Sequence, residues 1–187
     1  MTNVDADLEA LRRLLLEKAY EKKTVTLASG RVSDFYVDCR QVTLHGEGAR
    51  LVGRVIFERI RDGAQAVGGP TLGADPMVTA VSLTAALEGR DVPAFIIRKA
   101  EKGHGMQNRI EGAGNLKPGM KAAIIEDVVT TAASTFTAID AALAFGLEIA
   151  HVICLVDREE GGRENLAARG YELDAVFTRT SLVGERA

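Results

Sequence analysis

The chain has little cysteine and no long uninterrupted apolar run, and both absences reduce the number of function classes to which it can belong. Its only two cysteines, Cys39 and Cys154, are far apart, and neither belongs to a CxxC pair or stands beside a histidine at metal-ligand spacing. The sequence therefore offers no zinc site. No stretch of about 18 apolar residues occurs, and the charged amino terminus lacks the apolar core of a signal peptide. We therefore expect a cytoplasmic protein that does not associate with membranes.

Neither sign of charge dominates the sequence. It holds 23 Lys and Arg residues against 26 Asp and Glu, a formal net charge of -3, and the two signs are interleaved. Because no basic stripe could follow a nucleic-acid backbone, we expect no nucleic-acid partner. A small anionic substrate would need a local basic site. The length of 187 residues, 47% of them hydrophobic, suits one core, so residues 1–187 are predicted to form a single domain.

Apolar periodicity alternates between helical and extended segments along the chain. This order predicts an α/β fold with a mostly parallel central sheet flanked by helices, and a small hood formed by about the first 45 residues. In such sheets ligands bind beyond the carboxyl ends of the strands. Helices are expected at 5–21, 47–61, 77–87, 134–145 and 164–169, and strands at 64–67, 94–97, 121–125, 149–156 and 173–177. A long loop is expected at 98–119, with a short turn or hairpin inside it.

The segment AAIIEDVVTTAAST is typical of a phosphate site. An apolar strand leads into Glu126 and Asp127, and small or hydroxyl-bearing residues follow before a helix. Backbone N–H groups and the helix amino terminus can bind a phosphate there. The acids would repel it unless they face ribose hydroxyls or Mg²⁺, so the predicted ligand is a sugar phosphate. Alternatively, the hydroxyls only cap the helix and the acids are solvated. The predicted hydroxyl donors are Thr130, Thr131, Ser134 and Thr135.

A cationic run, RKAEKGHG, opens the long glycine-containing loop directly after a strand. Cations on a closing loop can neutralise an anionic leaving group and exclude water. By itself the run favours a solvated surface loop. The candidate residues are Arg98, Lys99, Lys102 and His104.

Another strand is followed by VGGPTLGADP, in which glycines permit close approach of the backbone to a phosphate. The glycine spacing is wrong for a dinucleotide fold, and no GxxxxGK[ST] motif occurs. Asp75 either orients Mg²⁺ through water or caps the next helix. Two histidines, His45 and His151, fit no motif and are interpreted as structural.

These segments resemble a known family. Glu126-Asp127-Val128-Val129-Thr130-Thr131, followed by two small residues and Ser134, resembles the signature of the type I phosphoribosyltransferases. RKxxKxHG resembles the mobile catalytic loop of the orotate phosphoribosyltransferases, and DREEGG, from Asp157, resembles their DRxEGG segment. VGGPTLGADP resembles the family's pyrophosphate loop, and SGRVSDFYVD its hood segment.

The resemblance implies a Mg²⁺-dependent homodimer that joins orotate to the ribose of phosphoribosyl pyrophosphate. It assigns the ribose hydroxyls to Glu126 and Asp127 and the pyrophosphate to the cationic loop, which would act across the dimer interface. His104 would act in acid–base catalysis or only hydrogen-bond a phosphate. Catalytic roles fall on Lys102, His104 and Asp127. The 5-phosphate falls to the loop Thr130, Thr131, Ala132, Ala133, Ser134 and Thr135, and the orotate to Thr130 and Arg158.

The chain departs from the family pattern at three small residues. Ala132 and Ala133 stand where glycine is usual or frequent, and alanine pays a steric cost wherever φ is positive. Ala28 replaces a lysine of some relatives. Phe35 and Tyr36 are predicted to cover the pyrimidine. The rival interpretations are a phosphoribosyltransferase for another base and a regulator that keeps the fold as a sensor and binds nucleic acid.

Overall fold

The computed structural model describes residues 4–22, 25–26, 32–33, 35–99 and 109–184. Its centre is a six-stranded sheet in the order β10-β9-β8-β5-β6-β7. All neighbouring pairs are parallel except β6 and β7, so the predicted mostly parallel α/β sheet is confirmed. The strands are β5 (Ala66–Pro70), β6 (Ala94–Ile97), β7 (Ile110–Glu111), β8 (Lys121–Val129), β9 (Glu148–Asp157) and β10 (Leu173–Thr178).

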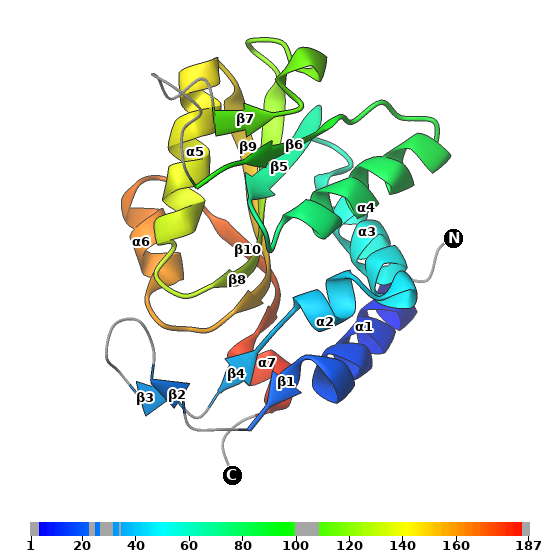
Figure 1. Ribbon diagram of the computed structural model, residues 1–187, viewed down its shortest axis with the longest axis vertical. Coiled ribbons are helices and arrows are strands. Elements are labelled where there is room, and N and C mark those ends of the chain that lie inside the picture. The colour runs from blue at the N-terminus through cyan, green and yellow to red at the C-terminus, as the bar shows by residue number, and fades with distance from the viewer. Residues whose placement is uncertain (1–3, 23–24, 27–31, 34, 100–108, 185–187) are drawn as a thin grey trace.

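Helices cover both faces of this sheet, as Figure 1 shows. On one face α3 (Gly46–Ile60) and α4 (Asp75–Leu87) pack their apolar sides into one core cluster. On the other, α5 (Ala133–Phe145) and α6 (Gly162–Ala168) contribute to a second cluster. The apolar stripes that predicted four of the helices are therefore the surfaces they bury. None of the helices in the described ranges is long and apolar enough to cross a membrane.

The amino-terminal segment adds α1 (Val4–Lys18), which buries Leu11 and Leu15 in the same cluster as α3. The predicted hood is built from short strands: β1 (Tyr20–Glu21) pairs with β4 (Tyr36–Val37), and β2 (Val25–Thr26) pairs with β3 (Val32–Ser33). Asp5 and Asp7 lie in the first turn of α1, where negative side chains interact favourably with the helix dipole.

Two short helices were not predicted, α2 (Arg40–Thr43) and α7 (Arg179–Val183), whereas β7 and a 3-10 turn at Ala113–Asn115 lie in the loop where a short turn or hairpin was expected. The two helices are too short for a periodic pattern to show. β8 is also longer than predicted, because it stays paired with β9 as far as Val129 opposite Asp157. Glu126 and Asp127 therefore lie within a strand whose backbone is fixed on its β9 side.

Candidate functional site

A cavity of about 320 Å³ opens between the hood and the carboxyl ends of the parallel strands. Residues from four separate segments line it, and each of these segments contains residues that were predicted to carry function. The lining residues are Tyr36, Val37, Asp38 and Arg40 from β4 and α2, Pro70–Gly73 after β5, Lys99 after β6, and Glu126–Val128 with Ser134 from β8 and α5. The fold thus brings the predicted acids and one predicted cation to a single site.

Glu126 is the most deeply placed acid of the cavity, with 5% of its surface exposed. Its Oε2 accepts hydrogen bonds from Ser134 Oγ at 2.9 Å and Thr135 Oγ1 at 3.0 Å. Burial, with a smaller contribution from the charge of Asp127, raises the pKa of Glu126 to about 7, against the opposing effect of the two hydroxyl hydrogen bonds. Thr135 is fully buried, so its predicted role as a hydroxyl donor to phosphate is wrong.

Asp127 is held by its own backbone and by a glycine. Its Oδ1 accepts the Val128 N–H at 2.9 Å, and burial raises the pKa of the carboxyl. A Cβ at Gly73 would come within 2.3 Å of the Asp127 carboxyl carbon, so glycine is required for the loop after β5 to approach the acid.

The other two glycines of the VGGPTLGADP motif allow close packing in the core instead. Gly68 and Gly69 lie inside the buried strand β5. A Cβ on Gly68 would meet the Phe95 ring at 2.2 Å, and one on Gly69 would meet the Ile125 carbonyl oxygen at 2.0 Å. The prediction that they bring the backbone close to a phosphate is therefore wrong, because both are enclosed by the sheet.

The turn from β8 into α5 contains the predicted phosphate-binding residues. Ala132 has φ 66° and ψ 18°, in the left-handed region, and it stands immediately before the first residue of α5. For alanine this conformation costs about 1–2 kcal/mol. The steric cost predicted for alanine at this position is therefore present. Thr131, Ala133 and Ser134 are exposed at the helix amino terminus, and Thr130 is half-buried.

Only the first part of the predicted cationic loop lies within the described residues. Lys99 is exposed and lines the cavity. Arg98 donates from Nη1 to Glu111 at 2.9 Å, and its N–H bonds to the Arg109 carbonyl oxygen. The antiparallel pairing of β6 with β7 therefore places Arg98 next to Arg109. This agrees with the hairpin that was predicted in the long loop. Lys102 and His104 lie outside the described residues.

Arg158 follows β9, as predicted, but its guanidinium is enclosed. The residue is 9% exposed, and its Nη2 lies 2.9 Å from Glu160 Oε1 and donates to the Phe35 carbonyl oxygen at 3.2 Å. It is not among the described residues that line the cavity. Phe35 is fully buried beside Tyr20, so its predicted role in covering a pyrimidine is wrong. Tyr36 does line the cavity.

Two further polar residues were misjudged or missed. Asp75 is the first residue of α4 and accepts the Thr71 hydroxyl at 2.8 Å, so it does not cap the helix. Arg40 was not singled out, yet it lines the cavity and donates to both carboxylate oxygens of Asp38, at 2.8 and 3.2 Å. These bonds lower the pKa of Asp38. The sequence feature that could have identified Arg40 is its position two residues after Asp38, the last residue of the hood segment.

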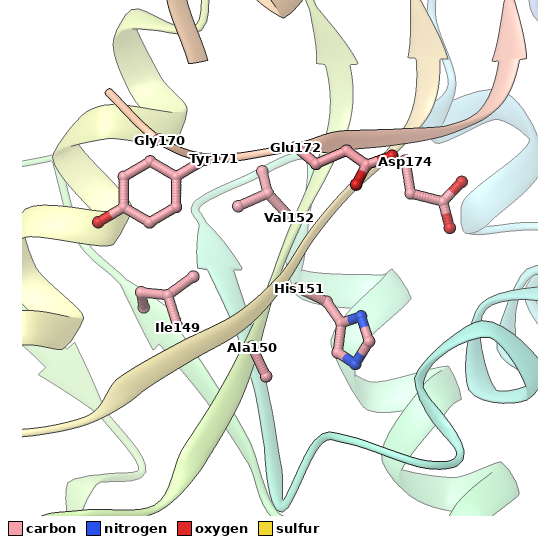
Figure 2. Close-up of a pocket in the computed structure, with 8 residues that line it drawn as sticks. All are labelled: Ile149, Ala150, His151, Val152, Gly170, Tyr171, Glu172 and Asp174. Atoms are coloured by element: carbon pink, nitrogen blue, oxygen red, sulfur yellow. The ribbon is translucent and has the colours of Figure 1, made fainter. Parts of the chain in front are cut away.

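A second cavity, of about 330 Å³, lies at the opposite ends of the strands (Figure 2). It is formed by the first residues of β9, including His151, and by Glu172 and Asp174 at the start of β10. A Cβ on Gly63 would come within 2.3 Å of His151 Nε2, so the ring packs against that turn. Ligands of parallel sheets bind at the carboxyl ends, which favours the first cavity as the functional site.

Comparison with known proteins gives one consistent result, although no family model matches the chain. The chain is 47% identical over 177 residues to an orotate phosphoribosyltransferase of Nostoc sp., covering 92% of this chain and 85% of that one. The Mycobacterium tuberculosis orotate phosphoribosyltransferase in complex with Fe(III) dicitrate has a TM-score of 0.81 at 38% identity, covering 95% and 99% of the two chains. The structure of that enzyme in complex with 5-phospho-alpha-D-ribosyl 1-diphosphate has a TM-score of 0.76 at 34% identity, covering 94% and 98%.

Proposed function

The chain belongs to the orotate phosphoribosyltransferase family, and we propose that it catalyses the reaction that names the family in the cavity between the hood and β8. It transfers the phosphoribosyl group of phosphoribosyl pyrophosphate to orotate, giving orotidine 5'-monophosphate and pyrophosphate in de novo pyrimidine biosynthesis. We place this activity in the cytoplasm. The observation that carries the proposal is the Glu126–Asp127 pair at the cavity wall, directly upstream of the turn into α5.

The ribose and its 5-phosphate would lie along β8 and the turn that follows. Glu126 and Asp127 accept hydrogen bonds from the ribose hydroxyls, which replaces part of the solvation that their burial removes. The 5-phosphate binds at the amino terminus of α5, where N–H groups without partners inside the helix and the helix dipole favour an anion. The contributing residues are Val128, Val129, Thr130, Thr131, Ala132, Ala133 and Ser134.

The pyrophosphate would face the cationic side of the cavity. Lys99 lines that side, and Arg98 lies at the base of the same loop, so Lys102 and His104 follow within a few residues. Fixed positive charges stabilise the negative charge that develops on the leaving oxygen. Breaking the bond from the anomeric carbon to pyrophosphate leaves positive character on the ribose ring, which the nearby Asp127 carboxylate stabilises as the orotate nitrogen attacks. No covalent enzyme intermediate is required.

Mg²⁺ is the proposed cofactor. Among the described residues, no group of three or more His, Cys, Asp or Glu is placed to hold a metal. This suits Mg²⁺, which keeps several waters and binds through one or two carboxylates together with substrate phosphates. Asp127, and Asp75 through water, are the proposed protein contacts. The ion would neutralise phosphate charge in the bound substrate.

The orotate carboxylate is proposed to bind Arg158, with Thr130 at the same site. A guanidinium recognises a carboxylate through two parallel hydrogen bonds, which suits a planar carboxylated pyrimidine. Arg158 and Thr130 come from neighbouring strand ends, since the Arg158 N–H bonds to the Val129 carbonyl oxygen at 3.0 Å. Arg158→Ala should chiefly raise the KM for orotate, and an unchanged value would contradict the assignment.

A homodimer is proposed to form through an apolar groove of about 650 Å³ between α2, α3 and α4. Leu44, Leu83 and Leu87 line it, and Leu87 is 80% exposed. The groove also includes Asp75 and Pro76, which are separated from the cavity loop 70–73 by a single residue. A second copy seated there would bring its chain close to the cavity, as a loop acting across the interface requires.

Sedimentation velocity tests this interface. Leu87→Lys should shift the protein from dimer to monomer, because a desolvated ammonium opposes burial. Leu143→Lys, an exposed leucine on α5 at the other face of the sheet, is the control and should remain dimeric. A Leu87→Lys protein that stays dimeric would place the interface elsewhere.

The loss of orotate absorbance on adding phosphoribosyl pyrophosphate and Mg²⁺ tests the reaction, with uracil, hypoxanthine and adenine as competing bases. Lys102→Ala should lower turnover on the order of 100-fold if it stabilises the leaving group. Mixing Lys102→Ala with Arg158→Ala protomers tests action across the interface. Hybrid dimers regain one complete site only if the loop serves the neighbouring subunit. A folded dimer that is inactive with orotate would refute the proposed function.

A further inference from the structure

One nitrogen atom of Arg158 is engaged by two oxygens. Nη2 forms an ion pair with Glu160 Oε1 at 2.9 Å and donates to the Phe35 carbonyl oxygen at 3.2 Å. The side chains of Arg158 and Glu160 are only 10% and 13% exposed, so water screens this ion pair weakly. The guanidinium that the proposed function assigns to orotate therefore already has a carboxylate partner within the chain.

The geometry of the guanidinium means that the Arg158–Glu160 pair affects how a carboxylate ligand can bind. A carboxylate can form two parallel hydrogen bonds either with Nε and Nη2 or with Nη1 and Nη2, and both arrangements use Nη2. That atom has two N–H bonds, and two acceptors already lie within hydrogen-bond distance of it. A carboxylate ligand can bind Arg158 in this way only after one of the two present oxygens has moved away.

The two oxygens differ in how firmly they are held. The Phe35 carbonyl belongs to the main chain of a residue whose ring is fully buried, 5.4 Å from the Tyr20 ring and 5.3 Å from the Arg179 guanidinium. Glu160 supplies a side-chain oxygen from the turn between β9 and α6, and rotation about its side-chain bonds can withdraw it. Glu160 is therefore the group that can exchange.

We propose that Glu160 is an internal substitute for the substrate carboxylate, which occupies Arg158 in the empty site and is displaced when orotate binds. This rests on the proposed function, and it adds a residue that sets orotate affinity. The exchange replaces one carboxylate by another, so the buried guanidinium keeps a counter-charge throughout. Leaving such a charge unpaired would be costly. The consequence is that Glu160 lowers the apparent affinity for orotate.

The neighbouring Glu159 provides a matched control. Its Oε2 accepts the Thr180 N–H at 2.9 Å and the Thr180 hydroxyl at 2.7 Å, which ties the turn to α7. It has the same side chain and is one residue away, but its hydrogen bonds lie on α7 rather than on Arg158. Glu159→Gln is therefore expected to keep the KM values of the wild type for both substrates.

The test compares Glu160→Gln with Glu159→Gln in the orotate assay. At saturating phosphoribosyl pyrophosphate, Glu160→Gln should lower the KM for orotate about 5-fold, because a neutral amide competes less well for the guanidinium. The KM for phosphoribosyl pyrophosphate should not change. The inhibition constant for uracil, which has no carboxylate, should also not change.

A purely structural role for Glu160 would instead alter uracil and orotate binding alike. An orotate KM that is unchanged or raised in Glu160→Gln would overturn the proposal. If that variant does not fold, Glu160→Asp keeps the charge but withdraws it by one methylene, and the same fall in KM is expected. Absence of orotate turnover in the wild type would instead refute the proposed function, so the two failures are distinguishable.

Discussion

The carboxyl ends of β8 and β9 lie side by side, yet their acids are in opposite electrostatic situations. On β8, neither Glu126 nor Asp127 forms an ion pair with any described residue, and burial raises the pKa of both. On β9, Asp157 lies 3.2 Å from Arg163 Nη2, and shortly after the strand Arg158 pairs with Glu160. Among the described residues, the acids at the end of β8 have no ion-pair partner, whereas the acids at the end of β9 are ion-paired.

This difference separates two ways of preparing a binding site. Buried acids that form no ion pair are costly in the empty protein and become favourable when a ligand supplies hydrogen-bond donors or a cation. A site with an internal ion pair costs less to keep empty, but its ligand must displace a partner. We expect the sugar phosphate to bind by the first route and the pyrimidine carboxylate by the second.

The largest expected effect comes from neutralising Asp127, one of the two buried acids at the end of β8. Asp127→Asn should lower kcat/KM on the order of 100- to 1000-fold, because the amide cannot stabilise positive character on the ribose ring. Steady-state kinetics measure this, with Asp140→Asn as the control, since Asp140 forms an exposed pair with Arg169. A loss below about 10-fold would mean that the β8 acids serve stability or binding only.

The second effect is a pH dependence of stability. Glu126 has a pKa of about 7 in the folded protein against an ordinary value of 4.5, so between these pH values the folded state binds more protons than the unfolded state. Its contribution to stability is therefore present below pH 4.5 and is lost as the pH rises through 7. Relative to Glu126→Gln, the wild type should lose about 3 kcal/mol of unfolding free energy over this interval.

Urea denaturation across that pH range measures the difference between the two proteins. Glu172→Gln, which removes an exposed carboxylate at the amino end of β10, is the control and should track the wild type. If the unfolding free energies of wild type and Glu126→Gln change with pH in parallel, the ionised form of Glu126 is not destabilised by folding. The contrast between β8 and β9 would then disappear.

The smallest effect concerns the turn after β8. Ala132→Gly should raise the free energy of unfolding by less than about 1 kcal/mol, because relief of the left-handed conformation is partly offset by the greater freedom of glycine in the unfolded chain. Ala133→Gly, one residue on and inside α5, should instead destabilise by about 1 kcal/mol. Equal changes in the free energy of unfolding at the two positions would contradict the strain at Ala132.

The sequence by itself determined the long elements and the chemistry of the turn after β8. Helical and extended periodicity, together with residue types at strand ends, are properties of near neighbours, so five strands, the main helices and the position of Glu126 and Asp127 could be predicted. Elements such as α7 could not, because a few residues carry no period and their stability comes from contacts such as the Thr178–Ser181 capping box and Glu159.

Only the tertiary structure decided which polar groups meet. Arg158 and Phe35 are 123 residues apart, and Ser134 and Thr135 reach Glu126 because α5 folds back beside β8. Burial then sets the cost of each charge, and burial depends on packing that no local pattern contains. The sequence therefore predicted a phosphate-binding turn and a functional arginine after β9, whereas the fold decided that the β8 acids form no ion pair with a described residue and that Arg158 pairs with Glu160.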